Sequence, residues 1–250
     1  MDKVKIIVAD LDDTLLPRDK TVSEYTKNVL RRCRNTGVKT VIATGRGHPE
    51  EVAPMDLFDG IIANNGANIF TGGIETRVCI PYAEARPLLL ACDARGLRLT
   101  SQFGGMHYTN FDISPIWHHI KDFIIVDFAS HAIDSEKICM EGVTQEDAAF
   151  IERQLTENMY LKVARDRLGM VMHRNATKSA AIAELARRWY ITRQEIVAFG
   201  DDLNDIDLLT YAGTGVAVDN ALAEVRAAAD YVCGACADDG VAKWLEKNIL

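Results

Sequence analysis

The sequence predicts an α/β protein with a doubly wound parallel sheet at its core and a second, α+β domain inserted into it. Short apolar runs that end in polar turns are typical of buried parallel strands. Segments with helical spacing of apolar residues lie between them, and strands that alternate with helices favour right-handed crossovers in one sheet. The predicted strands are 4–10, 38–46, 60–67, 195–202 and 213–218.

The predicted helices each carry an apolar face. The segment 23–37 places Val29, Leu30 and Cys33 on one side of a helix, and 177–189 has the same kind of apolar stripe. Two further helices with a similar pattern are predicted at 220–230 and 238–249.

The middle of the chain breaks this pattern. The segments 136–142, 161–166 and 168–174 alternate apolar and polar residues, which suits a sheet with one exposed face. Helices are predicted at 81–96 and 144–158. We therefore predict a core made of 1–80 and 175–250, with 81–174 inserted as a second domain.

Composition narrows the class of protein. The 250 residues are 48% apolar and 26% charged, which is an ordinary globular balance and argues against disorder. A net charge of −8 argues against nucleic acid as a partner. No apolar stretch is long enough for a signal-peptide core or a membrane span, so a cytoplasmic protein is expected. The sequence gives no oligomeric state.

The six cysteines are scattered, and free thiols are expected in a reducing compartment. Cys233 and Cys236 form a C-x-x-C pair without a second pair, so no zinc site is predicted there. The sequence assigns no role to these two residues.

Polar residues collect at the carboxyl ends of three predicted strands. They are Asp10, Asp12 and Asp13, then Thr44, Gly45 and Arg46, and then Gly200, Asp201, Asp202, Asn204 and Asp205. In an open parallel sheet these strand ends form one edge, where ligands bind. Three segments that are distant in sequence are therefore expected to meet at one site.

The residue types at this edge indicate phosphoryl transfer. Several carboxylates, with water and phosphate completing the shell, suit Mg²⁺. Thr44 can donate to a phosphate, and Lys178, with the N-terminus of its predicted helix, can hold an anion. Neighbouring carboxyl groups have divergent pKa values, so Asp10 is predicted as the nucleophile and Asp12 as the acid that later acts as base.

Four segments resemble, in order, the motifs of the haloacid dehalogenase-like (HAD) superfamily. They are "DLDDTLL", "ATGR", Lys178 and "GDDLNDIDLL". The C-terminal segment and "NNGA" at 64–67 resemble the Cof-type phosphatases of this superfamily, and the insertion matches their α/β cap in placement and size. The resemblance implies a Rossmann-like core and a cap that closes over the site and selects the substrate.

The resemblance also implies roles for individual residues. Asp10 would form an aspartyl-phosphate, and Asp12 would act as general acid and base. The implied metal ligands are Asp10, Asp12 through its carbonyl oxygen, Asp201 and, in or near the second layer, Asp205, with Asp202 as a further contributor. The predicted phosphate- and substrate-binding residues are Thr44, Gly45, Arg46, Asn65, Lys178 and Asn204.

Two residues keep two interpretations each. Arg46 either contacts the substrate or forms a salt bridge to a core carboxylate. Asn65 either binds substrate or caps a turn. Asp13 is interpreted as a turn residue that follows the first strand.

The leading functional hypothesis is a Mg²⁺-dependent phosphatase of a small phosphorylated metabolite, a sugar phosphate or a phosphorylated cofactor. One alternative is a phosphomutase or phosphotransferase that uses the same aspartyl-phosphate. Another is a non-catalytic sensor of a phosphate ligand. The paired acid and nucleophile, Asp12 and Asp10, argue against the sensor because binding alone does not need them.

Overall fold

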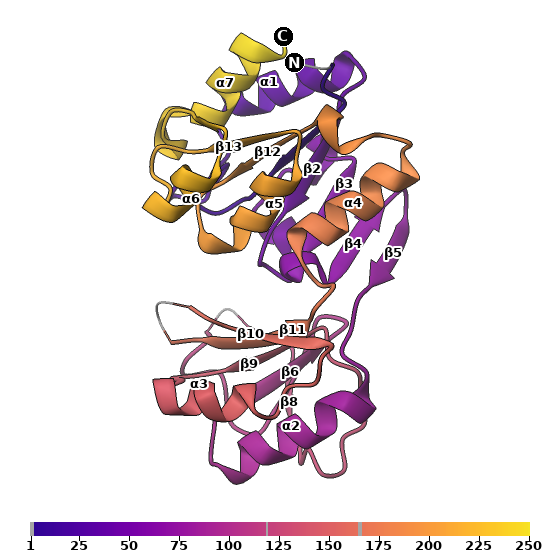
Figure 1. Cartoon of the computed structure of the whole chain (residues 1–250), viewed down its shortest axis with the longest axis vertical. Coiled ribbons are helices and arrows are strands. Elements are labelled where there is room, and N and C mark those ends of the chain that lie inside the picture. Colours follow the sequence, from indigo (N-terminus) through magenta and orange to yellow (C-terminus); the bar gives the residue numbers. More distant parts are fainter. Residues whose placement is uncertain (1–2, 119, 165–166) are drawn as a thin grey trace. The chain divides into compact units, whose positions relative to one another are not determined.

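The protein is represented by a computed structural model that describes residues 3–118, 120–164 and 167–250 (Figure 1). The chain divides into two compact units, Met1–Thr76 with Thr177–Leu250, and Arg77–Ala176. The predicted insertion, 81–174, falls within the second unit. Its role as a substrate-selecting cap stays a prediction.

The first unit is built on an eight-stranded sheet. Its strands are β1 Ile6–Ala9, β2 Lys39–Ala43, β3 Gly60–Ala63, β4 Asn68–Thr71, β5 Ile74–Arg77, β12 Ile196–Gly200, β13 Thr214–Ala217 and β14 Tyr231–Val232. They lie in the order β14-β13-β12-β1-β2-β3-β4-β5. All neighbours from β14 to β3 pair in parallel, and β4 is antiparallel to β3.

Five α-helices belong to this unit among the described residues. They are α1 Glu24–Asn35, α4 Lys178–Arg188, α5 Ile206–Tyr211, α6 Ala223–Ala228 and α7 Gly240–Asn248. The chain moves outward from β1 through α1 to β2, and in the opposite direction from β12 through α5 to β13. Right-handed crossovers place α1 and α5 on opposite faces of the sheet, so the predicted doubly wound α/β fold is confirmed.

The local sequence accounts for these elements. Every residue of β1 is buried, since this strand lies at the centre of the sheet with β2 and β12 on either side. At the start of α1 the Ser23 hydroxyl accepts a hydrogen bond from the Thr26 amide, and the helix buries Val29, Leu30 and Cys33 as predicted. The hairpin of β4 and β5 was not predicted, because neither strand has a continuous apolar run or clear apolar alternation.

The described residues of the second unit form a six-stranded sheet and two α-helices, α2 Tyr82–Ala94 and α3 Gln145–Glu152. Its strands are β6 Leu99–Phe103, β7 Met106–Thr109, β8 Phe123–Ile125, β9 Lys137–Met140, β10 Met159–Val163 and β11 Gly169–His173. Of the strand predicted at 161–166, residues 165 and 166 lie outside the described residues. Leu88 and Leu89 of α2 share a buried cluster with Leu99, Ile138 and Val171 of the sheet.

The helices of both units are short. Among the described residues, none combines the length and the apolar character that a bilayer-spanning helix requires.

Candidate active site

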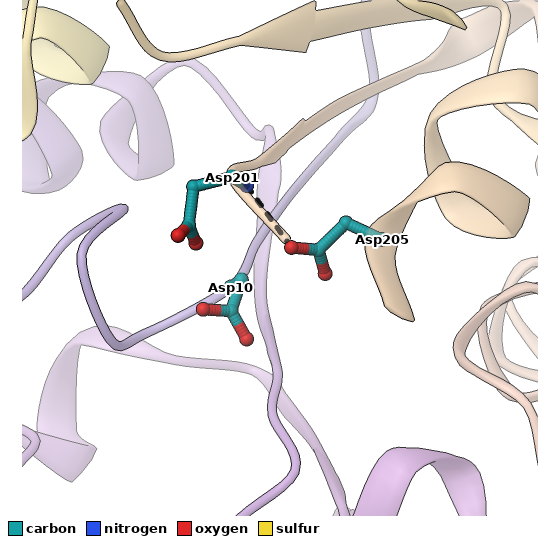
Figure 2. A group of neighbouring side chains, drawn as sticks. All are labelled: Asp10, Asp201 and Asp205. Atoms are coloured by element: carbon teal, nitrogen blue, oxygen red, sulfur yellow. Dashed lines mark hydrogen bonds between the residues drawn. The ribbon is translucent and has the colours of Figure 1, made fainter. Parts of the chain in front are cut away.

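Three acidic residues meet where β1 and β12 end. Asp10 directly follows β1, and its amide donates to the Phe199 carbonyl oxygen of β12 at 3.0 Å. Asp201 directly follows β12, and Asp205 lies four residues later. Carboxylate oxygens of Asp10, Asp201 and Asp205 lie within 4.8 Å of one another (Figure 2). The predicted convergence of distant segments at this sheet edge is therefore present in the structure.

The ammonium group of Lys178 lies between two of these carboxylates. Its Nζ is 2.6 Å from Asp10 Oδ1 and 2.6 Å from Asp205 Oδ1, and the lysine side chain is fully buried. Lys178 is the first residue of α4, whose N-cap is Thr177. The backbone of α4 therefore fixes where the positive charge enters the cluster.

The N-terminus of α4 itself is already occupied. The Ala180 amide donates to Thr177 Oγ1 at 3.1 Å, and the Ser179 amide donates to Asp207 Oδ2 at 3.0 Å. These two groups are therefore not open to a phosphate, contrary to the expectation that the helix end would help to bind the anion. From this helix end, the Lys178 side chain contacts the cluster directly.

Asp205 organises the loop that follows β12. Its Oδ2 accepts hydrogen bonds from the amides of Asp201 at 3.0 Å and Asp202 at 3.1 Å, while its Oδ1 contacts Lys178. A Cβ atom on Gly200 would lie 2.4 Å from Asp205 Cβ, so only glycine permits this close approach. Both oxygens of Asp205 are thus engaged in orienting their neighbours. Asp202 is exposed and its Oδ1 accepts from the Leu203 amide at 2.7 Å.

Burial dominates the acid–base properties of the cluster. It raises the pKa of Asp10 from 3.8 to about 8, while Lys178 opposes this rise and Asp205 adds to it. Burial and Asp205 also raise the pKa of Asp201 to about 7, against the Thr14 hydroxyl that donates to Asp201 at 2.9 Å. Burial alone would lower the pKa of Lys178, but Asp10 and Asp205 outweigh it and raise the pKa.

The cluster fits a divalent cation. The cluster combines three carboxyl groups with one ammonium group, that of Lys178. Buried carboxylates are costly without compensating positive charge. Oxygen donors at this spacing are those that hard cations such as Mg²⁺ prefer. Hydrogen bonds engage both oxygens of Asp205, whereas those of the described residues engage only Oδ1 of Asp10 and Oδ1 of Asp201.

Asp12 lies outside this cluster and has partners of its own. Arg46 holds its carboxylate with two hydrogen bonds, Nε to Oδ2 at 2.6 Å and Nη2 to Oδ1 at 2.8 Å. Lys20 Nζ lies 2.5 Å from the same Oδ1. Partial burial would raise the pKa of Asp12, but the hydrogen bonds from Arg46 and Lys20 hold it below its usual value. Of the two interpretations of Arg46, the structure shows a salt bridge, with Asp12.

Thr44 lies at the end of β2, and its loop is fixed by a turn at Asn64–Gly66. The Asn64 amide donates to the Arg46 carbonyl oxygen at 2.8 Å, and the Asn65 amide donates to the Thr44 carbonyl oxygen at 2.9 Å. The Thr44 hydroxyl is buried and accepts from the Arg46 amide at 3.1 Å, which leaves its hydrogen to donate to an anion.

Asn65 links this turn to the loop after β12. Its Oδ1 accepts from Asn204 Nδ2 at 3.0 Å, and its backbone is left-handed with φ +54°. A Cβ on Gly45 would lie 3.1 Å from the same oxygen. Asn65 is therefore a turn residue in this structure, and substrate contacts of Asn65, Asn204 and Gly45 stay predictions. Asp13, interpreted as a turn residue, is exposed with φ +56°.

Sequence reasoning missed Thr14 and Lys20. Thr14 follows the aspartate motif directly, so its position could have indicated a partner for a neighbouring carboxylate. Lys20 carries no such signal because only the fold of its loop brings it to Asp12. Cys233 and Cys236 are free thiols, and burial raises their pKa values to about 11 and about 12, which disfavours the thiolate form.

A family model for haloacid dehalogenase-like hydrolases matches residues 7–245. The chain belongs to this family. It is 28% identical over 258 residues to the 5-amino-6-(5-phospho-D-ribitylamino)uracil phosphatase YcsE of Bacillus subtilis, which covers 99% of this chain and 96% of that protein. It is also 28% identical over 280 residues to an HMP-PP phosphatase of Yersinia enterocolitica, covering 97% of this chain and 94% of the relative.

Solved structures of this family have the same fold. The HAD subclass IIB sugar phosphatase BT4131 matches with a TM-score of 0.86 and 25% identity, over 99% of this chain and 100% of that one. The phosphatase BT1666 from Bacteroides thetaiotaomicron matches with a TM-score of 0.85 and 25% identity, over 98% of this chain and 95% of that one. The predicted HAD superfamily, Cof-type membership and phosphatase class are thereby confirmed, and phosphatases of this family generally use a divalent metal.

The turn at Asn64–Gly66 gives a test of how the site is held. A Cβ on Gly66, whose φ is +109°, would lie 2.2 Å from the Thr177 carbonyl oxygen, whereas Gly72, with φ +56°, has open space around it. We expect Gly72→Ala to lower the free energy of unfolding by about 1 kcal/mol from backbone strain alone. Gly66→Ala should lower it by at least about 3 kcal/mol and also reduce activity, because Thr177 must move with Lys178 beside it.

Urea unfolding of both glycine variants, with activity assayed alongside, checks this expectation. Equal losses of stability in the two variants would contradict the contact between Gly66 and Thr177.

The acidic cluster gives a test in pH. Because burial raises the folded-state pKa of Asp10 to about 8 and that of Asp201 to about 7, these two carboxyl groups bind more protons in the folded protein than in the unfolded chain between about pH 4 and 8. The free energy of unfolding, measured in EDTA, is therefore expected to fall as the pH rises from 5 to 8. Asp201→Asn removes one titrating carboxyl group and should make this decline shallower.

Urea unfolding of wild type and Asp201→Asn at several pH values measures both slopes. An unchanged slope in the variant would show that Asp201 does not titrate in this interval.

Proposed function

We propose that the chain is a Mg²⁺-dependent phosphatase that hydrolyses a small phosphorylated metabolite through an aspartyl-phosphate on Asp10. The observation that carries the proposal is the buried Lys178, shared at 2.6 Å between Asp10 and Asp205, with Asp201 beside them. A nucleophilic carboxylate, a cation for the phosphoryl oxygens and ligands for a metal are thereby collected at one sheet edge.

In this proposal each residue has one task. Asp10 attacks phosphorus, and Lys178 and the Thr44 hydroxyl hold the phosphoryl oxygens. Asp10, Asp201 and the Asp12 carbonyl oxygen hold Mg²⁺, which supplies neutralising charge to the phosphoryl group when bound. Asp205, with both oxygens already engaged, orients Lys178 and the Asp201 backbone instead of binding the metal through its carboxylate.

The proton balance assigns Asp12 both acid and base roles. As an oxygen of Asp10 bonds to phosphorus, the bond from phosphorus to the leaving oxygen breaks, and Asp12 gives its proton to that oxygen. A water then gives a proton to Asp12 and attacks phosphorus, which releases phosphate from Asp10. Arg46 and Lys20 hold the pKa of Asp12 low in the free protein, and the negative charge of a bound phosphomonoester would raise it.

The substrate class follows from the relatives. Their names specify a phosphorylated flavin precursor, HMP-PP and sugar phosphates, which are all small phosphorylated molecules. We therefore propose a sugar phosphate or a phosphorylated cofactor as substrate. The unit Arg77–Ala176 is proposed to select among them, since the residues of the acidic cluster and its lysine all belong to the other unit.

Phosphate release across a panel of phosphorylated metabolites, with Mg²⁺ and with EDTA, tests this proposal. Metal-dependent release is expected, with one class of substrate preferred. Asp10→Asn should lower kcat/KM by at least about 10³-fold, because the nucleophile is lost. Asp56→Asn, which changes an exposed aspartate of the same unit, serves as the matched control and should leave the rate unchanged.

Full activity of Asp10→Asn would overturn the proposal. A protein that transfers phosphate to a sugar hydroxyl without net release would instead be a mutase. Tight binding of the panel compounds without turnover would indicate a sensor.

A further inference from the structure

Lys20 makes a contact that the motifs do not account for. Its ammonium group lies 2.5 Å from Asp12 Oδ1, which already accepts a hydrogen bond from Arg46 Nη2 at 2.8 Å. The two cations approach from different segments, Lys20 from the loop after β1 and Arg46 from the loop after β2. The Asp12 carboxylate therefore binds two cationic side chains, Lys20 and Arg46, which the fold positions independently of each other.

The loop that carries Lys20 is shaped to return it to Asp12. The Lys20 amide donates to the Pro17 carbonyl oxygen at 2.8 Å, and Lys20 has a left-handed backbone with φ +58°. The Asp13 amide donates to the Leu16 carbonyl oxygen at 2.9 Å, which closes the preceding turn. Leu16 and Val22 are buried on either side of Lys20 and anchor the loop in the core.

The Lys20–Asp12 contact differs from an ordinary surface ion pair in the number of cations that bind one carboxylate. Lys5 pairs with Glu195 at 2.6 Å, one lysine to one carboxylate, at the opposite ends of β1 and β12 from Asp10 and Asp201. Such exposed pairs contribute little to stability. Asp12 already accepts two hydrogen bonds from Arg46, which compensate its charge. The third donor, Lys20, therefore serves mainly to fix the orientation of the carboxylate.

The distribution of donors over the two oxygens is uneven. Oδ1 of Asp12 accepts from both Lys20 and Arg46 Nη2, while Oδ2 accepts from Arg46 Nε at 2.6 Å. A carboxylate oxygen has two in-plane lone pairs. With Oδ1 occupied by two cationic donors, Oδ2 is the oxygen that retains a lone pair for the proton.

We propose that Lys20 is a positioning residue for Asp12: it fixes the carboxylate so that Oδ2 carries the proton delivered to the leaving oxygen. This inference rests on the proposed function, in which Asp12 is the acid. Lys20 acts through Asp12 and Arg46 and does not itself touch the phosphoryl group. Replacement of Lys20 should therefore lower the rate most for substrates whose leaving oxygen needs a proton.

The dependence of rate on the leaving group tests this role. An alkyl phosphate leaves as a basic alkoxide and needs the acid, whereas p-nitrophenyl phosphate leaves as a stable phenolate and depends on it far less. We expect Lys20→Met to lower kcat/KM for an alkyl phosphate by about tenfold and for p-nitrophenyl phosphate by only about twofold. The ratio kcat/KM reports the steps up to departure of the leaving group, whichever later step limits kcat.

Two variants accompany this measurement. Lys20→Arg keeps a cationic donor and should restore most of the rate on the alkyl phosphate. Lys5→Met removes a lysine with a single carboxylate partner away from Asp12 and should change neither rate.

The outcomes separate this inference from the proposed function. Equal losses on both substrates with Lys20→Met, or no loss on either, would overturn the role of Lys20. Asp12→Asn provides the reference, because it should lower the rate on the alkyl phosphate far more than the rate on p-nitrophenyl phosphate. If Asp12→Asn lacks that selectivity, the assignment of Asp12 as the acid fails, whatever Lys20→Met does.

Discussion

The ammonium group of Lys178, held between Asp10 and Asp205, is the interaction on which the rest of the site depends. A buried lysine and two buried carboxylates are each costly alone, and they persist because each compensates the others. Asp205 also fixes the backbone of Asp201, because its Oδ2 accepts a hydrogen bond from the Asp201 amide. Removal of Lys178 would leave both carboxylates in the core without this positive partner, so the ion pairs at the candidate site also stabilise the fold.

The parts of this arrangement that sequence predicts are those fixed by the backbone. Apolar runs identify β1, β2 and β12 as buried parallel strands, and the carboxyl ends of such strands meet at one edge. Asp10 and Asp201 follow two of these strands directly, so their approach depends on topology alone. Lys178 opens the helix that the apolar stripe of 177–189 predicts. These residues could therefore be assigned before the structure.

The parts that sequence does not predict depend on side chains that meet only after folding. Arg46 kept two interpretations, because whether it reaches Asp12 depends on two loops closing together. Asn65 was a substrate contact or a turn residue, and its bond to Asn204 is visible only in the fold. The free helix end expected beside Lys178 is occupied by Asp207, from a helix that is distant in sequence. The hairpin of β4 and β5 was missed for the different reason that Asn68–Thr71 and Ile74–Arg77 lack a continuous apolar run and are only partly buried.

The central claim is that Asp10, next to Lys178, becomes phosphorylated. Mass spectrometry of the Asp12→Asn protein, mixed with p-nitrophenyl phosphate and quenched in acid, tests it most directly, because this leaving group depends little on the acid while loss of the base slows hydrolysis of the intermediate. The account predicts one phosphoryl group on the peptide that contains Asp10, and none when Asp10 is also replaced by asparagine. Turnover by wild type with no phosphorylated Asp10 in this variant, or with the phosphoryl group on another residue, would contradict the account.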